Sequence, residues 1–375
     1  MTKTLVLLFD GTSNEIEENR TNILRLYGTL KKDDQQIVYY DPGVGTIGST
    51  RGMSRIWRKT VEIWGMAFGR GLDGNVLEAY RFLVDTYAPG DRVFVMGFSR
   101  GAYTARVLAG FLHAFGLMQP RNLNLLGYAY RAYKAVKAAD PTTFKALELH
   151  KRILQPAEVA IDGMALFDTV ASVFEPGAVF PRLRSLAHTT YNPSVSAVRH
   201  ALAMDERRIM FRPLHWPSEQ THVSGGTSRP QDNKEVWFAG VHGDIGGGYP
   251  EAKSALAKIP LEWMIRETET LGLRFDRELV DALVLGKDID GRYTSPDANA
   301  PANRSLNAAW SLLEIATLNL RLTTQAGNWL ALRLTAGTAR EIKSGARIHA
   351  SVLKRLEART TKPPGNLPET YETEL

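Results

Sequence analysis

The chain has 375 residues, of which 44% are hydrophobic, so it is long enough to bury a large core. It contains no cysteine, which excludes disulfides, thiolate metal sites and a cysteine nucleophile. The formal net charge is +6, but basic residues are spread along the chain and no nucleic-acid-binding motif accompanies them, so we expect no nucleic-acid partner. No apolar run is long enough for a membrane span or a secretory signal. We therefore expect cytoplasmic synthesis, with any export proceeding without a cleavable signal peptide.

Apolar runs alternate with helical patterns in the first part of the chain. Residues 4–9 (TLVLLF) predict a strand that ends at Asp10, and a second β-rich run ends at Asp41. Apolar residues at helical spacing predict a helix over 72–87, which Pro89 and Gly90 end. The run RVFVMGF then predicts a buried strand, and the residues after Ser99 predict another helix.

The second part of the chain adds two apolar runs and several longer segments. The run MALF ends at Asp168, and the run VWFAGV ends at His242. Two stretches look like insertions onto the sheet core: about 117–160, which is mostly helical by pattern, and about 175–235, which is irregular. Residues 260–358 predict helices, and the polar, Pro-rich residues 361–375 predict an extended or disordered C-terminal tail.

Alternating strands and helices predict an α/β fold of the α/β-hydrolase kind, with a mainly parallel central sheet and helices on both faces. We expect one catalytic domain over residues 1–360. Functional groups of such sheets gather at the carboxyl ends of the strands. Five polar residues lie where a predicted strand ends: Asp10, Asp41, Ser99, Asp168 and His242.

The sequence Gly-Phe-Ser-Arg-Gly places Ser99 between Gly97 and Gly101, after a strand and before a helix. This Gly-x-Ser-x-Gly pattern is typical of a sharp strand-to-helix turn that exposes a nucleophilic serine. The crowded backbone favours glycine at both flanking positions. We expect the backbone N–H of Arg100 to be the first oxyanion donor. The alternative is a plain strand–helix turn built from small residues.

A nucleophilic serine needs an acid and then a base later in the chain. Asp168 and His242 fit this order and both follow predicted strands. A strand-end aspartate is often only a helix cap, and a lone histidine is usually structural. We therefore keep His349 as a reserve base and Asp244 as a reserve acid, although Asp244 is close enough to His242 to orient its loop instead.

The loop after the first predicted strand can supply the second oxyanion donor. We assign this role to the backbone N–H of Gly11 or Thr12, with Asp10 positioning the loop. A haloacid-dehalogenase phosphatase would need an aspartate where this chain has Leu8. The segment GDIGGGY lacks the Lys-Ser/Thr of a phosphate-binding P-loop. The spacing of the acidic residues and His242 demands no metal, so we expect neither a metal nor a cofactor.

Six motifs occur in order and together resemble the catalytic domain of the Tle-type phospholipase effectors of type VI secretion. They are LFDGTSN, GDRVFVMGFSRGAYTARVLAGF, LFDTVASV, HALAMDERR, EVWFAGVHGDIGGGY and RIHASVLKRL. The resemblance runs from about residue 3 to about residue 368. It implies an α/β-hydrolase fold, cofactor-free hydrolysis of lipid esters and a triad of Ser99, Asp168 and His242. The larger toxin members carry a further C-terminal region, and from the length of this chain we expect no such region here.

These observations lead us to expect a serine hydrolase that cleaves carboxylic esters through an acyl-enzyme, with phospholipids as the expected substrates. A soluble esterase, thioesterase or acyltransferase on a small acyl substrate is the alternative, and a catalytically silent partner-binding module is a third. The expected partners are a lipid or ester substrate, a membrane surface touched transiently, and an immunity or delivery protein. Residues 53–71, which include Trp57 and Trp64, mix aromatic and basic residues that could contact a lipid interface, and the alternative is a half-buried helix over the core.

Overall fold

The computed structural model describes residues 2–11, 19–43, 71–136, 141–170, 174–175, 182–183, 186–208, 211–305, 339–358 and 364–375. The strands are β1 (Thr4–Phe9), β2 (Gln36–Asp41), β3 (Arg92–Phe98), β4 (Ile161–Phe167), β5 (Phe174–Glu175), β6 (Arg182–Leu183), β7 (Val195–Ala203), β8 (Thr221–Ser224), β9 (Thr227–Pro230), β10 (Asp232–Phe238), β11 (Ala346–His349) and β12 (Tyr371–Glu374). The helices are α1 (Asn22–Thr29), α3 (Leu72–Thr86), α4 (Arg100–Ala114), η1 (Pro120–Leu125), α5 (Leu126–Ala135), α6 (Pro141–Leu154), α7 (His242–Gly246), η3 (Glu251–Lys253), α8 (Ala255–Thr270), α9 (Arg277–Leu283) and α12 (Ala350–Ala358).

Eight strands form the central sheet in the order β12-β11-β10-β7-β4-β3-β1-β2, and each neighbouring pair is parallel. Strand β2 pairs with one side of β1, and the next strand of the central sheet, β3, pairs with the other side of β1. The order therefore reverses between β1 and β3, and open α/β sheets bind ligands at such a switch point, beyond the carboxyl ends of the strands. The predicted α/β fold with a parallel sheet is confirmed.

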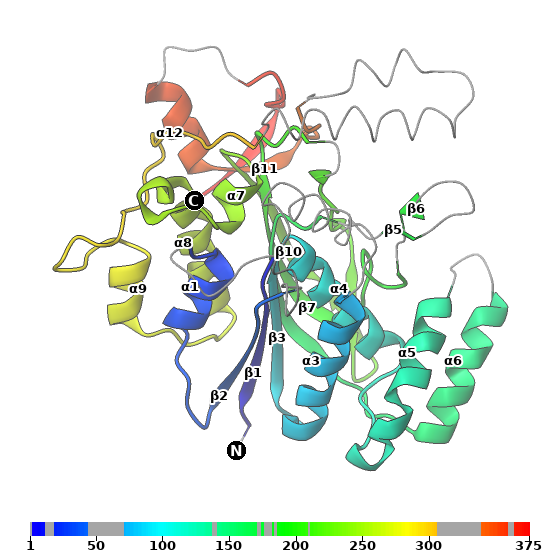
Figure 1. Ribbon diagram of the computed structural model, residues 1–375. Coiled ribbons are helices and arrows are strands. Elements are labelled where there is room, and N and C mark those ends of the chain that lie inside the picture. Colours follow the sequence, from blue (N-terminus) through cyan, green and yellow to red (C-terminus); the bar gives the residue numbers. More distant parts are fainter. Residues whose placement is uncertain are drawn as a thin grey trace, which may run out of the picture.

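Helices cover both faces of the sheet, so its strands are apolar on both sides (Figure 1). Strand β1 shows the alternation, because Leu5, Leu7 and Phe9 pack into one core with α3, α4 and α5. Val6 and Leu8 point to the opposite core, which α1, α8 and α9 cover. This two-sided burial explains why the strand reads in the sequence as one continuous apolar run.

Two predictions about the chain's organisation are wrong, and a third is incomplete. The stretch 175–235 is not simply an insertion, because it contains β7, which lies between β4 and β10. In the tail that we expected to be extended or disordered, residues 371–374 are extended, but they form β12 and pair with β11. Strand β11 itself lies within the range 260–358, where only helices were predicted. The expected helices of the 117–160 stretch are present as η1, α5 and α6.

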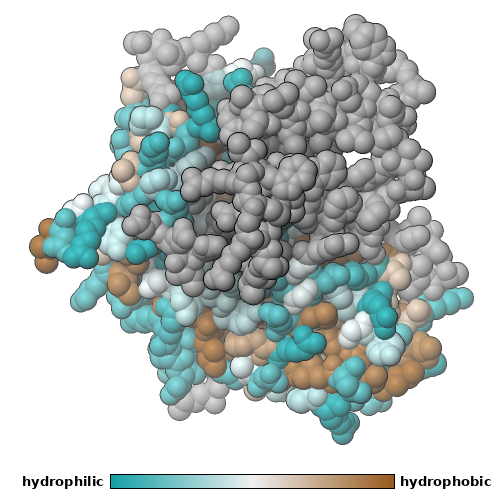
Figure 2. Space-filling model, viewed as in Figure 1, coloured by the Kyte–Doolittle hydropathy of each residue, from teal (hydrophilic) through white to brown (hydrophobic). Residues whose placement is uncertain are grey.

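Exposed apolar side chains gather over α5 and α6, at the lower right of Figure 2. On α6, Leu149 and Ile153 are one helical turn apart and are both exposed. Among the helices that the structure describes, none combines the length and the apolar composition needed to cross a bilayer. The segment 53–71, with Trp57 and Trp64, lies outside the described residues.

The turn between β3 and α4 is packed tightly against the end of β1. A Cβ atom at Gly97 would lie 2.5 Å from the backbone nitrogen of Ala102. A Cβ atom at Gly101 would lie 2.2 Å from the carbonyl oxygen of Phe9 and 2.4 Å from that of Asp10. The prediction that the backbone is crowded at both glycines is confirmed.

We expect Gly101→Ala to lower the free energy of unfolding by about 1–3 kcal/mol, because its new methyl group would meet backbone atoms that cannot move aside. Gly127→Ala on α5 is the matched control, since a Cβ atom there meets nothing within 4 Å. That change should raise stability by up to about 1 kcal/mol. Urea denaturation followed by circular dichroism measures both, and equal behaviour of the two variants would contradict the packing of the turn.

Candidate active site

Three polar residues, Ser99, Asp168 and His242, follow strands of the central sheet and so lie at the carboxyl ends of its strands. Phe98 pairs with Phe167 across β3 and β4, and the backbone N–H of Ser99 donates to the Phe167 carbonyl at 3.0 Å. Ser99 and Asp168 therefore follow the ends of neighbouring strands. His242 begins α7 shortly after β10, which lies on the far side of β7. Two of the glycines that follow His242, Gly243 and Gly246, belong to this short helix.

Ser99 has a left-handed backbone conformation, with φ 58° and ψ −117°. A non-glycine residue adopts such angles only where its surroundings hold it, and residues of this kind cluster at functional sites. Ser99 directly precedes α4 and is 8% exposed. The N–H groups of the first turn of α4, including that of Arg100, have no acceptor within the helix, so they can face an anion.

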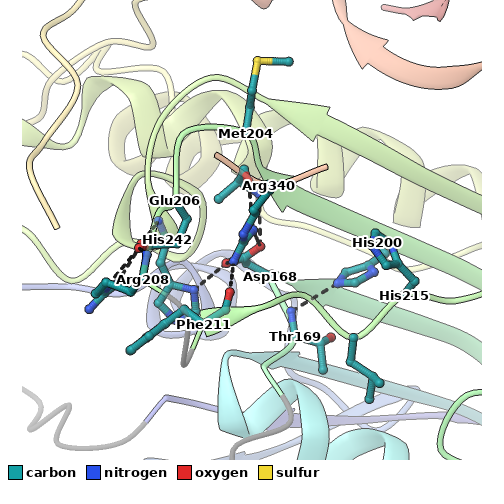
Figure 3. A network of polar contacts seen from close by, with 12 residues as sticks. Asp168, Thr169, His200, Met204, Glu206, Arg208, Phe211, His215, His242 and Arg340 are labelled. Carbon is teal, nitrogen blue, oxygen red and sulfur yellow. Dashed lines mark hydrogen bonds and ion pairs between the residues drawn. The ribbon is translucent and has the colours of Figure 1, made fainter. Parts of the chain in front are cut away.

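His242 and Asp168 form a hydrogen-bonded pair, with the imidazole Nδ1 2.6 Å from the Asp168 Oδ2 (Figure 3). Because Nδ1 donates to the carboxylate, Nε2 is left as the acceptor. The Phe98 ring lies 4.7 Å from the imidazole, and the Phe211 ring meets it edge-on at 4.9 Å. Phe98 directly precedes Ser99, so the imidazole packs on the residue next to the predicted nucleophile.

The charges of this pair are set by burial and by neighbouring groups. Burial alone would raise the pKa of Asp168, but the charge of Arg340 and the hydrogen bonds from His242 and Arg340 hold it well below its ordinary value. Burial lowers the pKa of His242, against the opposing effect of the Asp168 carboxylate. The pair therefore favours a charged carboxylate beside a neutral imidazole, which can accept a proton at Nε2.

Glu206 bonds to the backbone of His242 and is itself paired with Arg208. The Glu206 Oε2 accepts from the His242 N–H at 3.2 Å, and the Arg208 Nη2 lies 2.8 Å from the same oxygen. Arg208 also stacks on Phe211, with 3.5 Å between the guanidinium carbon and the ring centroid. Burial would raise the pKa of Glu206, but Arg208 lowers it to about 2, so this carboxylate is charged.

The loop after β1 differs from the expected oxyanion loop in one respect. The Gly11 N–H donates to the Asp10 Oδ1 at 2.6 Å, so in this arrangement it is not free to face a substrate. The other oxygen of Asp10 accepts from Thr21 at 2.5 Å and from the Tyr40 hydroxyl at 2.9 Å. Asp10 thus connects the end of β1 with the residue that caps the start of α1 and with strand β2. Thr12 lies outside the described residues.

The two reserve candidates have other contacts. Asp244 accepts from the Val241 N–H at 3.0 Å and from the Asn303 side chain at 2.6 Å, so it caps α7. Its pKa is raised by burial. His349 lies 2.8 Å from the Ser351 hydroxyl through Nδ1, and its ring stacks on Phe238.

The sequence assigned no role to Glu206, Arg208 or Arg340. The first two lie in the motif HALAMDERR, and that motif was the available signal for them. Arg340 belongs to no motif, yet its guanidinium donates to both oxygens of Asp168, at 2.6 and 3.0 Å. It is separated from Asp168 by 172 positions in the chain.

The chain is similar to a curated protein and to two solved structures. It is 35% identical over 225 residues to the uncharacterized protein YEL023C of Saccharomyces cerevisiae, which covers 56% of this chain and 32% of that protein. A crystal structure of an uncharacterized protein from Pseudomonas aeruginosa matches 88% of this chain and 52% of its own, at 18% identity and a TM-score of 0.42. The structure of the Tle1 effector bound to the VgrG spike from the type 6 secretion system matches 68% and 53%, at 19% identity and a TM-score of 0.36.

The chain thus spans about a third of the curated relative and about half of each solved chain. With these low TM-scores, the assignment of the fold rests on the order and direction of the strands in this chain. Residues 3–267 match the sequence profile of the catalytic domain of Tle1-like phospholipase effectors of the type VI secretion system. This range contains Ser99, Asp168 and His242, and it covers most of the chain. The chain therefore belongs to the Tle1-like phospholipase effector catalytic domain family.

Proposed function

We propose that this chain is a serine hydrolase that cleaves the carboxylic ester bonds of phospholipids through Ser99, Asp168 and His242. One observation carries the proposal. The His242–Asp168 pair, joined at 2.6 Å, lies at the same sheet edge as the left-handed Ser99 turn. Membership of a phospholipase effector family supports lipid esters as the substrate class.

In the proposed reaction, His242 Nε2 takes the proton of the Ser99 hydroxyl as its oxygen attacks the ester carbonyl. The Arg100 N–H, at the start of α4, stabilises the oxyanion that forms. The carbon–oxygen bond then breaks, and His242 returns the proton to the departing alcohol, which leaves an acyl group on Ser99. Water, deprotonated by His242, then attacks that acyl group, and the bond to Ser99 breaks as His242 returns the proton to the Ser99 oxygen, which releases the fatty acid.

The side chain of Arg100 favours an anionic substrate. Its Nη2 atom is buried and has no hydrogen-bond partner among the described residues. Burial lowers the pKa of this guanidinium to about 9, because removal from water disfavours its charge. A phosphate group bound beside Ser99 would supply the missing partner. A small neutral ester would not, and this is the reason for preferring a phospholipid over the soluble-esterase alternative.

Delivery is a proposal separate from the chemistry. The family is named for type VI secretion effectors, and we propose that a delivery protein carries this domain in a cell that secretes it.

We expect Ser99→Ala to reduce hydrolysis of phospholipid vesicles and of p-nitrophenyl butyrate by at least about 1,000-fold. It should also abolish labelling by a fluorophosphonate probe, with unchanged thermal unfolding. The matched control is Ser194→Ala. Ser194 lies 2.6 Å from His113, but it precedes β7 and so lies at the opposite edge of the sheet. A wild-type protein that is folded but neither labelled nor active would support the silent binding module instead.

The pH dependence follows from the lowered pKa of His242. Only the neutral imidazole can take the serine proton, and a lowered pKa keeps it neutral to more acidic pH. We therefore expect kcat/KM for a neutral ester to fall on the acidic side with an apparent pKa below 6.5, the ordinary value for histidine. A pH profile of p-nitrophenyl butyrate hydrolysis, followed at the isosbestic wavelength, measures it. A midpoint above 6.5 would argue against a neutral, buried base.

Arg100→Met should separate the two substrate classes. The backbone N–H remains, so we expect hydrolysis of p-nitrophenyl butyrate to change less than about threefold, while kcat/KM for phosphatidylglycerol vesicles falls about 10-fold or more. The loss of one charge-assisted hydrogen bond explains the difference. Arg131→Met on α5, whose guanidinium stacks on Tyr128, is the control for a general effect of charge on vesicle binding. Equal losses on both substrates would remove the side chain from headgroup recognition.

A further inference from the structure

Arg340 contacts three parts of the candidate site, although it lies outside the range that matches the family (Figure 3). Its Nη1 atom donates to the Asp168 Oδ1 at 2.6 Å and to the Ala203 carbonyl, at the end of β7, at 2.8 Å. Its Nη2 atom donates to the Asp168 Oδ2 at 3.0 Å and to the Phe211 carbonyl. Both Arg340 and Asp168 are buried, with 5% and 0% of their side chains exposed.

The Asp168 carboxylate is saturated by these contacts. Oδ1 accepts from Arg340 and from the Ala203 N–H at 3.0 Å, and Oδ2 accepts from His242 and Arg340. A bidentate guanidinium fixes the plane of a carboxylate as well as its position. With Arg340 in place, the oxygen that faces His242 cannot turn away from Nδ1.

Arg340 also holds a residue that packs against the His242 ring. Phe211, whose carbonyl it binds, places its ring edge-on against the His242 imidazole. The backbone of Arg340 is anchored in turn, because the Asn366 side chain donates to its carbonyl at 3.1 Å and to that of Met204 at 2.9 Å. Through these bonds, one residue joins the acid, the end of β7 and the packing of the base.

The charge of Arg340 has a separate effect. Among the described residues, the charged groups that act on His242 are Asp168, Glu206 and Arg208, and Arg340 pairs with both oxygens of the Asp168 carboxylate. A carboxylate that faces a single imidazole stabilises its protonated form strongly. A carboxylate whose charge is shared with a guanidinium stabilises it less. Arg340 thus helps to keep His242 neutral and available as a base.

We propose that Arg340 is a positioning residue, which fixes the Asp168 carboxylate against His242 and limits how strongly that carboxylate stabilises the imidazolium. This proposal rests on the proposed hydrolase function for its kinetic consequence. It rests on the contacts of Arg340 alone for its effect on His242.

The test compares Arg340→Gln, which removes the charge, with Arg340→Lys, which keeps the charge but loses the bidentate contact. The control is Arg199→Lys. Arg199 is also buried and pairs with two carboxylates, Asp232 at 2.8 Å and Glu267 at 2.6 Å. It lies on β7, away from the end that meets the site. Kinetic constants for p-nitrophenyl butyrate are measured from pH 4 to 9, with thermal unfolding as a check on folding.

We expect kcat to fall about 10- to 100-fold in both Arg340 variants with little change in KM, because the base is held less well. In Arg340→Gln the acidic limb should also move to higher pH by about one unit, whereas in Arg340→Lys it should stay near the wild-type position. Arg199→Lys should change neither. An unchanged pH profile in Arg340→Gln, with any loss of activity matched by lost stability, would overturn the proposal and leave a structural role.

A second measurement does not need enzymatic activity. Titration of ¹⁵N-histidine-labelled protein by NMR follows the His242 ring directly, with Ser99→Ala and His242→Gln used to assign and isolate its signals. A higher His242 pKa in Arg340→Gln supports the proposal even if wild type hydrolyses no ester. An identical pKa overturns it even if the protein is an active hydrolase. If Arg340→Gln does not fold, Arg340→Lys still decides the positioning role through its kcat and through the His242 Nδ1 proton signal.

Discussion

The candidate site depends on one buried charge, the Asp168 carboxylate. A carboxylate with no exposure to water remains ionised only if donors and opposite charge surround it. The donors come from distant parts of the chain: the end of β7, the start of α7, and Arg340 ahead of β11. Holding this charge therefore requires the central strands and the segment around residue 340 to be correctly packed at the same time. The site and the fold are stabilised by the same contacts.

The parallel sheet explains why the groups meet where they do. Because all eight strands of the central sheet run in one direction, the residues that follow them collect at one edge. Ser99 follows β3, next to the point where the strand order reverses, and Gly97 and Gly101 allow the turn to approach the end of β1. Phe98 then links the turn to the base, since its ring packs against His242, while a Cβ atom on Gly246 would meet the same ring at 1.9 Å.

Sequence reasoning failed where polar residues are buried. Strand β7 carries Arg199 and His200, so its sequence looks irregular and solvated. In the fold, however, Arg199 pairs with Glu267, and His200 lies 2.8 Å from Glu235. The pairing of strand β12 with the sheet could not be predicted for a different reason. Its sequence, YETE, has almost no apolar residues, and its place in the sheet comes from backbone pairing with β11 at the edge. Neither strand can be recognised from its own sequence, because the carboxylates that pair with the β7 side chains and the backbone of β11 that pairs with β12 lie elsewhere in the chain.

The sequence by itself determined the features that depend on neighbouring residues. These are the buried strands read from continuous apolar runs, the glycines on either side of Ser99, and the positions of Asp168 and His242 after strands, because local sterics and hydrophobic periodicity act over a few residues. Only the tertiary structure decided which groups surround those side chains. It paired Asp168 with Arg340, 172 positions away, and bonded Glu206 to the backbone N–H of His242, 36 positions away. Such contacts are fixed by packing between distant segments, and no local pattern in the chain records which buried charge will meet which donor.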